Sequence, residues 1–239
     1  MLAIYKREMR SYFTTSIGYI FLASALIIAA VIFSISTVFS QTSDTSVYFA
    51  GMIFVLMIFL PILTMKTFSD EKRTKTEQLL LTSPVSTTQM VLGKFFSAFT
   101  MLVIFLALTL VFLLPLSSYV GEGANGPNAA LVMGNMLALL LVGMSFIAIG
   151  VFVSSLTENQ FAAIVITIVI LLFMFVINLF NSLIGVYAIR VILDWLSVYS
   201  RYQAFTYGIF DIGALIYYLS VAGVFIFLTV RVFESRKYR

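Results

Sequence analysis

The stretch AAIVITIVILLFMFVI, residues 162–177, contains no charged side chain and a single hydroxyl, that of Thr167. The stretch ALIIAAVIF, residues 25–33, is equally apolar. Neither alternates apolar with polar residues, as the strands of a membrane barrel do, so both are typical of helices in contact with lipid. They predict an all-α membrane protein, in which each spanning helix needs about 20 mainly apolar residues.

The composition of the chain agrees with lipid as its main solvent. Of its 239 residues, 62% are hydrophobic and 10% are charged, whereas soluble domains have about 45–50% apolar and about 25% charged residues. The absence of cysteine excludes disulfides and thiolate metal sites, and the absence of histidine excludes a Ser-His-Asp triad and HExxH zinc chemistry. The chain is also too apolar for a nucleic-acid binder, and we expect it to hold no metal.

Six stretches without charged residues are long enough to cross a bilayer. We predict spans near residues 17–39, 47–66, 95–117, 130–154, 161–181 and 211–231, which form one transmembrane domain over residues 1–239. Small residues of the fourth span and two amides near the end of the fifth favour close helix packing, with substrate contact as the alternative. They are Gly134, Ala138, Gly143, Ala148, Gly150, Asn178 and Asn181.

Basic residues predict the orientation of the spans. Twelve of the 14 lie before the first span, between the second and third spans, or after the sixth: Lys6, Arg7, Arg10, Lys66, Lys72, Arg73, Lys75, Lys94, Arg231, Arg236, Lys237 and Arg239. The positive-inside rule places these segments, and with them both termini, in the cytoplasm. A cleaved signal peptide is the alternative at the N-terminus, but the apolar run is too long for one and no clear small-x-small site follows it.

The segment before the first span has the pattern of an amphipathic helix. Leu2, Tyr5, Met9, Tyr12 and Phe13 recur at three- and four-residue spacing, and Lys6, Arg7, Glu8 and Arg10 occupy the other face. The pattern predicts a helix in the membrane interface, with its basic groups near anionic headgroups. One alternative is a basic flank that only sets the topology. The other is an interface helix that also contacts a cytoplasmic partner.

The segment KTFSDEKRTKTEQLLLTSPVSTTQMVLGK, residues 66–94, is too long and too patterned for a simple connection. We expect a short helix that begins at a cap formed by Ser69 or Asp70 and ends before Pro84. Its start is charged and its end carries the leucines 79–81, which need an apolar surface to bury them. That surface is either the membrane face of this protein or the groove of a partner. The alternative is a solvated loop whose leucines return to the bilayer.

Two further segments outside the spans carry candidate sites. The loop SSLTENQ, residues 154–160, is either a tight turn, with Ser154 or Thr157 as the cap of the next helix, or a second contact for a partner. On the opposite side, residues 182–210 hold Arg190 and Asp194 four positions apart, where they can pair on one helical face. Aromatic residues of that segment suit the headgroup layer. They are Trp195, Tyr199, Tyr202 and Tyr207.

The chain has no visible source of energy for transport. Its only Gly-Lys pair, Gly93–Lys94, has Thr88 where a phosphate-binding loop has its first glycine, so we interpret Lys94 as an interfacial anchor at a helix start. Every charged residue is expected at a helix end or in a loop, which leaves no proton carrier within the membrane. Uphill transport would therefore need energy from another subunit.

The segment EKRTKTEQLLLTSPVSTTQMVLGK, residues 71–94, resembles the first cytoplasmic loop of ABC-2 type transporter permeases. Nine residues fit the family pattern: Thr76, Glu77, Leu79, Leu80, Ser83, Pro84, Leu92, Gly93 and Lys94. Lys75 replaces the usual glycine. The segments KREMRSYFTTSIGYIFL (6–22), FLPILTMKTFSDEK (59–72), IAIGVFVSSLTENQ (147–160) and LTVRVFESRKYR (228–239) look like the gliding-motility-associated branch of that family.

The resemblance implies the permease half of an ATP-driven exporter in the bacterial plasma membrane, not itself an enzyme. A separate cytoplasmic ABC ATPase, which holds ATP and magnesium, would dock on the first cytoplasmic loop. The implied coupling residues are Asp70, Glu71, Arg73, Thr76, Glu77, Gln78, Leu79, Leu80 and Pro84, with Lys6, Arg7 and Arg10 at the N-terminal interface.

Further partners implied by the resemblance are a second permease copy or a homologue, and in this branch often an auxiliary membrane protein with a large external domain. Short external helices would re-enter the outer leaflet, with Arg190, Asp194, Trp195 and Arg201 as gate candidates or as parts of an interfacial belt. A passive channel or a membrane scaffold without an ATPase is the alternative function. A membrane enzyme is disfavoured, because the sequence has no clustered carboxylates besides lacking histidine and cysteine.

Overall fold

The computed structural model describes residues 1–40, 44–76, 86–114, 129–181, 193 and 197–237. Every element in this part of the chain is a helix. In chain order they are α1 (Leu2–Thr14), α2 (Ser16–Phe33), the π-helical η1 (Ser34–Val38), α3 (Ser46–Thr64), α4 (Lys66–Arg73), α6 (Thr87–Thr109), the short η2 (Leu110–Leu113), α8 (Ala129–Leu156), α9 (Gln160–Asn181), α11 (Val198–Thr206) and α12 (Ile212–Lys237).

Within the described residues, six helices are long and apolar enough to cross a membrane, which confirms the predicted fold class. They are Ser16–Val38, Ser46–Arg73, Thr87–Leu113, Ala129–Leu156, Gln160–Ile177 and Ile212–Arg236. Three predicted ends are wrong: the second span continues seven residues past 66, to Arg73, the third begins at Thr87 instead of 95, and α12 runs past 231 to Lys237. Charged residues end the apolar run but not the helix, because Lys, Arg and Glu are good helix formers outside the lipid.

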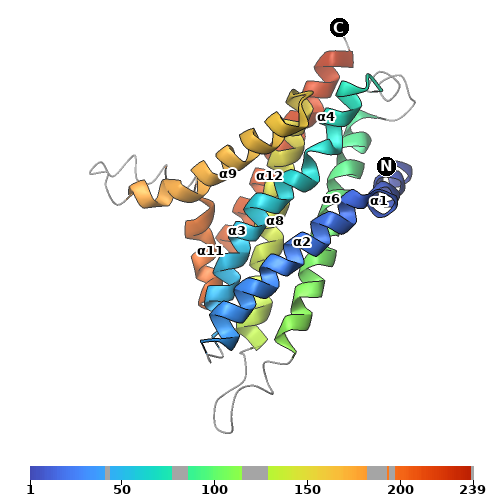
Figure 1. Cartoon of the computed structure of the whole chain (residues 1–239). Coiled ribbons are helices and arrows are strands. Elements are labelled where there is room, and N and C mark those ends of the chain that lie inside the picture. Colours follow the sequence, from blue (N-terminus) through green and yellow to red (C-terminus); the bar gives the residue numbers. More distant parts are fainter. Residues whose placement is uncertain (41–43, 77–85, 115–128, 182–192, 194–196, 238–239) are drawn as a thin grey trace.

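Helix α8 lies at the centre of the bundle and packs against α3, α6, α9, α11 and α12 (Figure 1). Two of its glycines face neighbouring helices at close range. A Cβ atom on Gly150 would lie 2.2 Å from Thr64 Oγ1 of α3, and one on Gly143 would lie 2.4 Å from Leu102 Cδ2 of α6. Small residues therefore set the helix spacing here, as the sequence predicted for α8.

Helices α2, α9 and α12 bury only part of their surface in the bundle. Each leaves large apolar side chains exposed, among them Ile27, Val165 and Val224. Exposed faces of this composition are what a surrounding bilayer or a second membrane chain requires.

The N-terminus, α4 and the end of α12 lie toward the same end of the bundle, and α11 lies toward the other (Figure 1). We call the end that holds the N-terminus the basic end. It contains α1, α4, the start of α6, the α8–α9 turn and the end of α12. The three predicted basic segments therefore come together in space. At Thr15 the backbone is extended (φ −97°, ψ 154°), so α1 does not continue along the axis of α2.

Candidate functional site

The ammonium group of Lys94 is the most buried charge at the basic end. Lys94 is 1% exposed, and its Nζ lies 2.8 Å from Glu71 Oε1 and 3.5 Å from Glu8 Oε1. It also donates a hydrogen bond to the carbonyl oxygen of Thr67 and lies 4.7 Å from the centre of the Phe68 ring. A buried charge of this kind needs such partners, because an isolated one is strongly unfavourable.

This burial corrects two predictions. Lys94 is enclosed by the protein and so is not an interfacial anchor, and it is not at the start of its helix. Helix α6 begins at Thr87, after Ser86 caps it by accepting a hydrogen bond from the backbone N–H of Gln89. Lys94 therefore lies two turns inside α6, where it faces α1 and α4.

Arg7 joins the same group of charges from α1. Its Nη2 lies 2.9 Å from Glu8 Oε1 and 3.0 Å from Glu71 Oε1. Burial lowers the pKa of the Arg7 guanidinium, but its hydrogen bonds and charge interactions with Glu8 and Glu71 outweigh that effect, so the net pKa is raised. We call Arg7, Glu8, Glu71 and Lys94 the charge cluster; it holds two cations and two anions from three helices.

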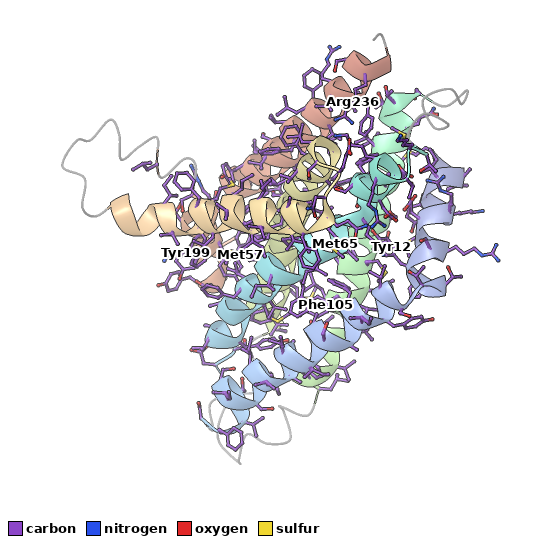
Figure 2. All side chains as sticks on the ribbon, turned by 45° about the horizontal axis from the view of Figure 1, so that its top comes forward. Tyr12, Met57, Met65, Phe105, Tyr199 and Arg236 are labelled. Carbon is purple, nitrogen blue, oxygen red and sulfur yellow. The ribbon has the colours of Figure 1, made fainter. Side chains whose placement is uncertain are left out.

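A cavity of about 340 Å³ lies beside the charge cluster. Besides the cluster it is lined by Tyr12 and Thr67, among others. In Figure 2, Tyr12 lies between α1 and the helices of the bundle. Burial raises the pKa of the Tyr12 hydroxyl, and the charge of Glu8 raises it further, so this phenol is neutral.

The face that α1 presents to the bundle differs from the predicted one. Ile4 is buried and Glu8 points inward to Lys94, whereas Leu2 and Phe13 are exposed. Gly93 accounts for the close approach of α1 to α6, because a Cβ there would lie 3.1 Å from Ile4 Cγ2. The helix itself is confirmed, and Lys6 and Arg10 are exposed as predicted.

On its other side α4 is bound to α8 through Ser154. The Ser154 Oγ accepts hydrogen bonds from the backbone N–H groups of Phe68 (3.0 Å) and Ser69 (3.1 Å), and it donates one to the carbonyl oxygen of Met65 (3.0 Å). The Ser69 hydroxyl donates in turn to the Ser154 carbonyl oxygen at 3.0 Å. A serine of α8 thus satisfies N–H groups in the first turn of α4, which a cap would otherwise serve.

The predicted helix start at Ser69 or Asp70 is therefore wrong. Helix α4 follows α3 directly at Lys66 and ends at Arg73, so Asp70 and Glu71 lie near its end. Ser154 is likewise not the cap of α9, because it is buried inside α8. Asn159 serves α9 instead, since its Oδ1 accepts the N–H of Phe161 at 2.9 Å.

The turn between α8 and α9 also contacts α4. Asp70 Oδ1 accepts hydrogen bonds from Arg73 and from Gln160, each at 2.8 Å. Lys72 donates to the carbonyl oxygen of Leu156 at 3.2 Å and lies 3.7 Å from Glu158. Residues 157–159 thus form a short turn whose surroundings hold the end of α4 in place, and a contact with a partner at this turn stays a prediction.

The other coupling candidates have separate outcomes. Thr76 Oγ1 donates to the Glu71 carbonyl oxygen at 3.3 Å. Lys75, at the position where the resembled family has glycine, adopts a left-handed backbone with φ +58°. Glu77, Gln78, Leu79, Leu80 and Pro84 lie outside the described residues.

At the opposite end, hydrogen bonds join α11 to the bundle. Tyr202 donates to Asn135 Oδ1 of α8 at 3.0 Å, and Tyr218 of α12 donates to the Val198 carbonyl oxygen at 2.8 Å. Of the gate candidates, Arg201 lies 6.0 Å from the ring centre of Tyr217. Arg190, Asp194 and Trp195 lie outside the described residues.

Sequence reasoning missed Glu8, Lys94 and Asn135 as bonded groups of the protein interior. For Lys94 a signal was present, because Ser86 before an apolar-periodic run predicts an earlier helix start. For Asn135 the signal was an amide in an otherwise apolar span.

Comparison with known proteins identifies the family of this chain. No curated protein matches the chain. The family model described as ABC-2 family transporter protein matches residues 24–233, a range that contains the second to fifth spans whole and most of the first and the sixth. With its six spanning helices, this multi-pass membrane chain belongs to the ABC-2 family of transporter proteins.

Proposed function

We propose that this chain is the permease subunit of an ATP-driven exporter and that a separate ABC ATPase docks on the loop between α4 and α6. The observation that carries the proposal is the double attachment of α4, the helix that leads into this loop. The charge cluster holds α4 to α1 and α6, and Ser154 and Gln160 hold it to α8 and α9. A displacement of the loop would therefore reach several spanning helices.

The sequence supports an external source of energy. It lacks the G-x-x-x-x-G-K-[ST] loop that binds nucleotide phosphates. We assign ATP and magnesium to the partner, and we assign docking to Glu77, Gln78 and the leucines 79–81, together with Asp70 and Arg73 near the end of α4. The apolar leucines would fill a groove on the ATPase while Glu77 pairs with a basic group there.

The remaining assignments complete this proposal. The basic end faces the cytoplasm of a bacterial cell, with α1 in the inner-leaflet interface, by the positive-inside rule. Two copies of the chain, or this chain and a homologue, enclose the path with their exposed apolar faces, and an auxiliary membrane protein can join them. Arg190, Asp194, Trp195 and Arg201 belong to the external gate. The link to the gliding-motility branch rests on the sequence motifs alone.

The test is a reconstitution. The purified chain and the ABC ATPase encoded beside it are placed in nanodiscs separately and together, and ATP turnover is measured. We expect no turnover by the chain alone and a stable complex whose turnover differs from that of the free ATPase. Failure of every neighbouring ABC ATPase to bind the chain would contradict the proposal and favour a channel or a scaffold.

A further inference from the structure

The two attachments of α4 differ in kind. Toward α8, backbone N–H and carbonyl groups bond to the hydroxyl of Ser154, and all these groups are neutral. Toward α1, the attachment depends on ions. Glu8 of α1 and Glu71 of α4 both approach the ammonium of Lys94, and Arg7 of α1 also pairs directly with Glu71 at 3.0 Å.

The net charge of the contact between α1 and α4 depends on Lys94. With Lys94 in place, the charge cluster is neutral and both carboxylates are attracted to one point. Without its charge, Glu8 and Glu71 would share only Arg7, and one negative charge would remain in a site where both carboxylates are less than one-fifth exposed. Loss of the ammonium would therefore weaken the attraction that holds α1 to α4.

Helix α1 is separate from the first spanning helix, so its position depends on its contacts with α4 and α6. Its backbone leaves the helix at Thr15, so it is not an extension of α2. Its other described contacts with the bundle are uncharged: the Tyr5 hydroxyl is 3.0 Å from Thr100 Oγ1, Ile4 packs on Gly93, and the Tyr12 hydroxyl interacts with Thr67 of α4 and Ser97 of α6. The charge cluster is thus the ionic contact that joins α1 to α4.

We propose that Lys94 is the positioning residue that makes α1 follow α4 when the ATPase moves the loop, so that α1 moves in the membrane interface during each ATP cycle. This inference rests on the proposed function, because it takes the loop as the docking site. To that function it adds the movement of α1 and the dependence of this movement on Lys94. Lys94 contacts neither the ATPase nor a substrate in this account.

The experiment follows two probes in the complex with the ATPase. Because the chain has no cysteine, Lys6→Cys on the exposed side of α1 and Thr74→Cys at the end of α4 each give one labelling site. Spin labels at these sites are observed in nanodiscs with and without a non-hydrolysable ATP analogue. We expect both labels to respond to nucleotide in the otherwise unchanged chain.

Lys94→Met should weaken the response at position 6, where the Arg7–Glu71 pair remains, and leave the response at position 74. Lys66→Met is the matched control, because Lys66 lines the same cavity from the start of α4 and makes no described ion pair; both responses should persist there. The double variant Lys94→Met/Glu71→Gln removes both charges of the closest pair. It should bind the ATPase and melt near the parent chain, yet lose the response at position 6, because Arg7 then has no carboxylate partner on α4.

Three results would overturn the inference. In the first, the label at position 6 responds as fully in Lys94→Met as in the parent chain. In the second, it does not respond in the parent complex although the label at position 74 does. In the third, both responses disappear in the double variant, so that Lys94 and Glu71 act on docking and not on α1. Absence of any ATPase complex with the parent chain contradicts the proposed function itself, and the inference falls with it.

Discussion

The ammonium nitrogen of Lys94 in α6 lies 2.8 Å from the carboxylate of Glu71 in α4. Helix α1 supplies a further partner to each of them, because Glu8 lies 3.5 Å from Lys94 and Arg7 lies 3.0 Å from Glu71. Three segments that are far apart in the sequence thus meet in one ion-pair cluster at the basic end. Glu71 of the cluster lies near the end of α4, the helix that leads into the loop that we assign to the ATPase. The predictions below test the contacts around it, the orientation of the bundle and the docking itself.

Ser154→Ala should destabilise the attachment of α4 to α8. The change leaves the buried N–H groups of Phe68 and Ser69 without their acceptor, and an unsatisfied buried polar group costs about 1–3 kcal/mol. Thermal unfolding in nanodiscs measures the loss. Ser155→Ala is the control, because the Ser155 hydroxyl donates only within its own helix, to Phe152. Equal stability of the two variants would contradict the role given to Ser154.

Gly150→Ala should force α3 and α8 apart. The new Cβ would lie 2.2 Å from Thr64 Oγ1 and 3.1 Å from Thr64 Cβ, so one of the two helices must shift. Overpacking of this kind costs about 1–3 kcal/mol, measurable as a lower melting temperature. Gly134→Ala is the control, because its nearest contact would be an ordinary 3.8 Å. Adding Thr64→Ala should recover part of the loss; no recovery would place the strain elsewhere.

Lys75→Val should be less stable than Lys75→Gly. Lys75 has φ +58°, a left-handed conformation that costs an L-residue about 1–2 kcal/mol and is worst for β-branched side chains. Glycine adopts it without that penalty, although it has more entropy to lose on folding. The melting temperatures of the two variants give the comparison. A more stable valine variant would show that the turn relaxes when its residue changes.

The cysteine-free sequence allows a direct measurement of orientation. Cysteines at Asp44, Asn125 and Ser200 should react with an impermeant thiol reagent added to intact cells, and those at Thr74 and Ser235 should react only after lysis; Asp44 is used because its neighbour Thr45 is buried. The reason is the concentration of basic residues at the end that carries Thr74 and Ser235. Labelling of Thr74→Cys from outside would reverse the assignment.

The spans were predictable because each depends on a local property, a long apolar run. The charge cluster was not, because its members become neighbours only after folding. Glu8 was assigned to the solvent face of α1, since three basic residues near it suggested a single charged face. The packing of Ile4 on Gly93 rotates α1 so that Glu8 meets Lys94, a residue 86 positions later in the chain.

The predicted end of the second span shows the same limit. Lys66 was taken as the end of the second span because it is charged, but α4 continues to Arg73. What holds this continuation is Ser154, whose hydroxyl has no sequence signature that distinguishes it from a helix cap. Motif reasoning placed a candidate site between residues 66 and 94, and tertiary contacts decide which of its residues are buried.

The most direct test of the central claim is the association of the ATPase with loop variants. Glu77→Lys replaces an attraction with a repulsion, and Leu80→Asp places a charge in an apolar groove; loss of a desolvated charge pair costs about 2–5 kcal/mol, and loss of a buried anchor about 2 kcal/mol or more. Leu80→Met, which keeps the side chain apolar, is the control. The measurement is the amount of ATPase that co-purifies with each variant, normalised to the amount of the chain in the membrane. We predict that Glu77→Lys and Leu80→Asp lose the ATPase while Leu80→Met retains it; wild-type association of both charged variants would show that the ATPase does not dock on this loop.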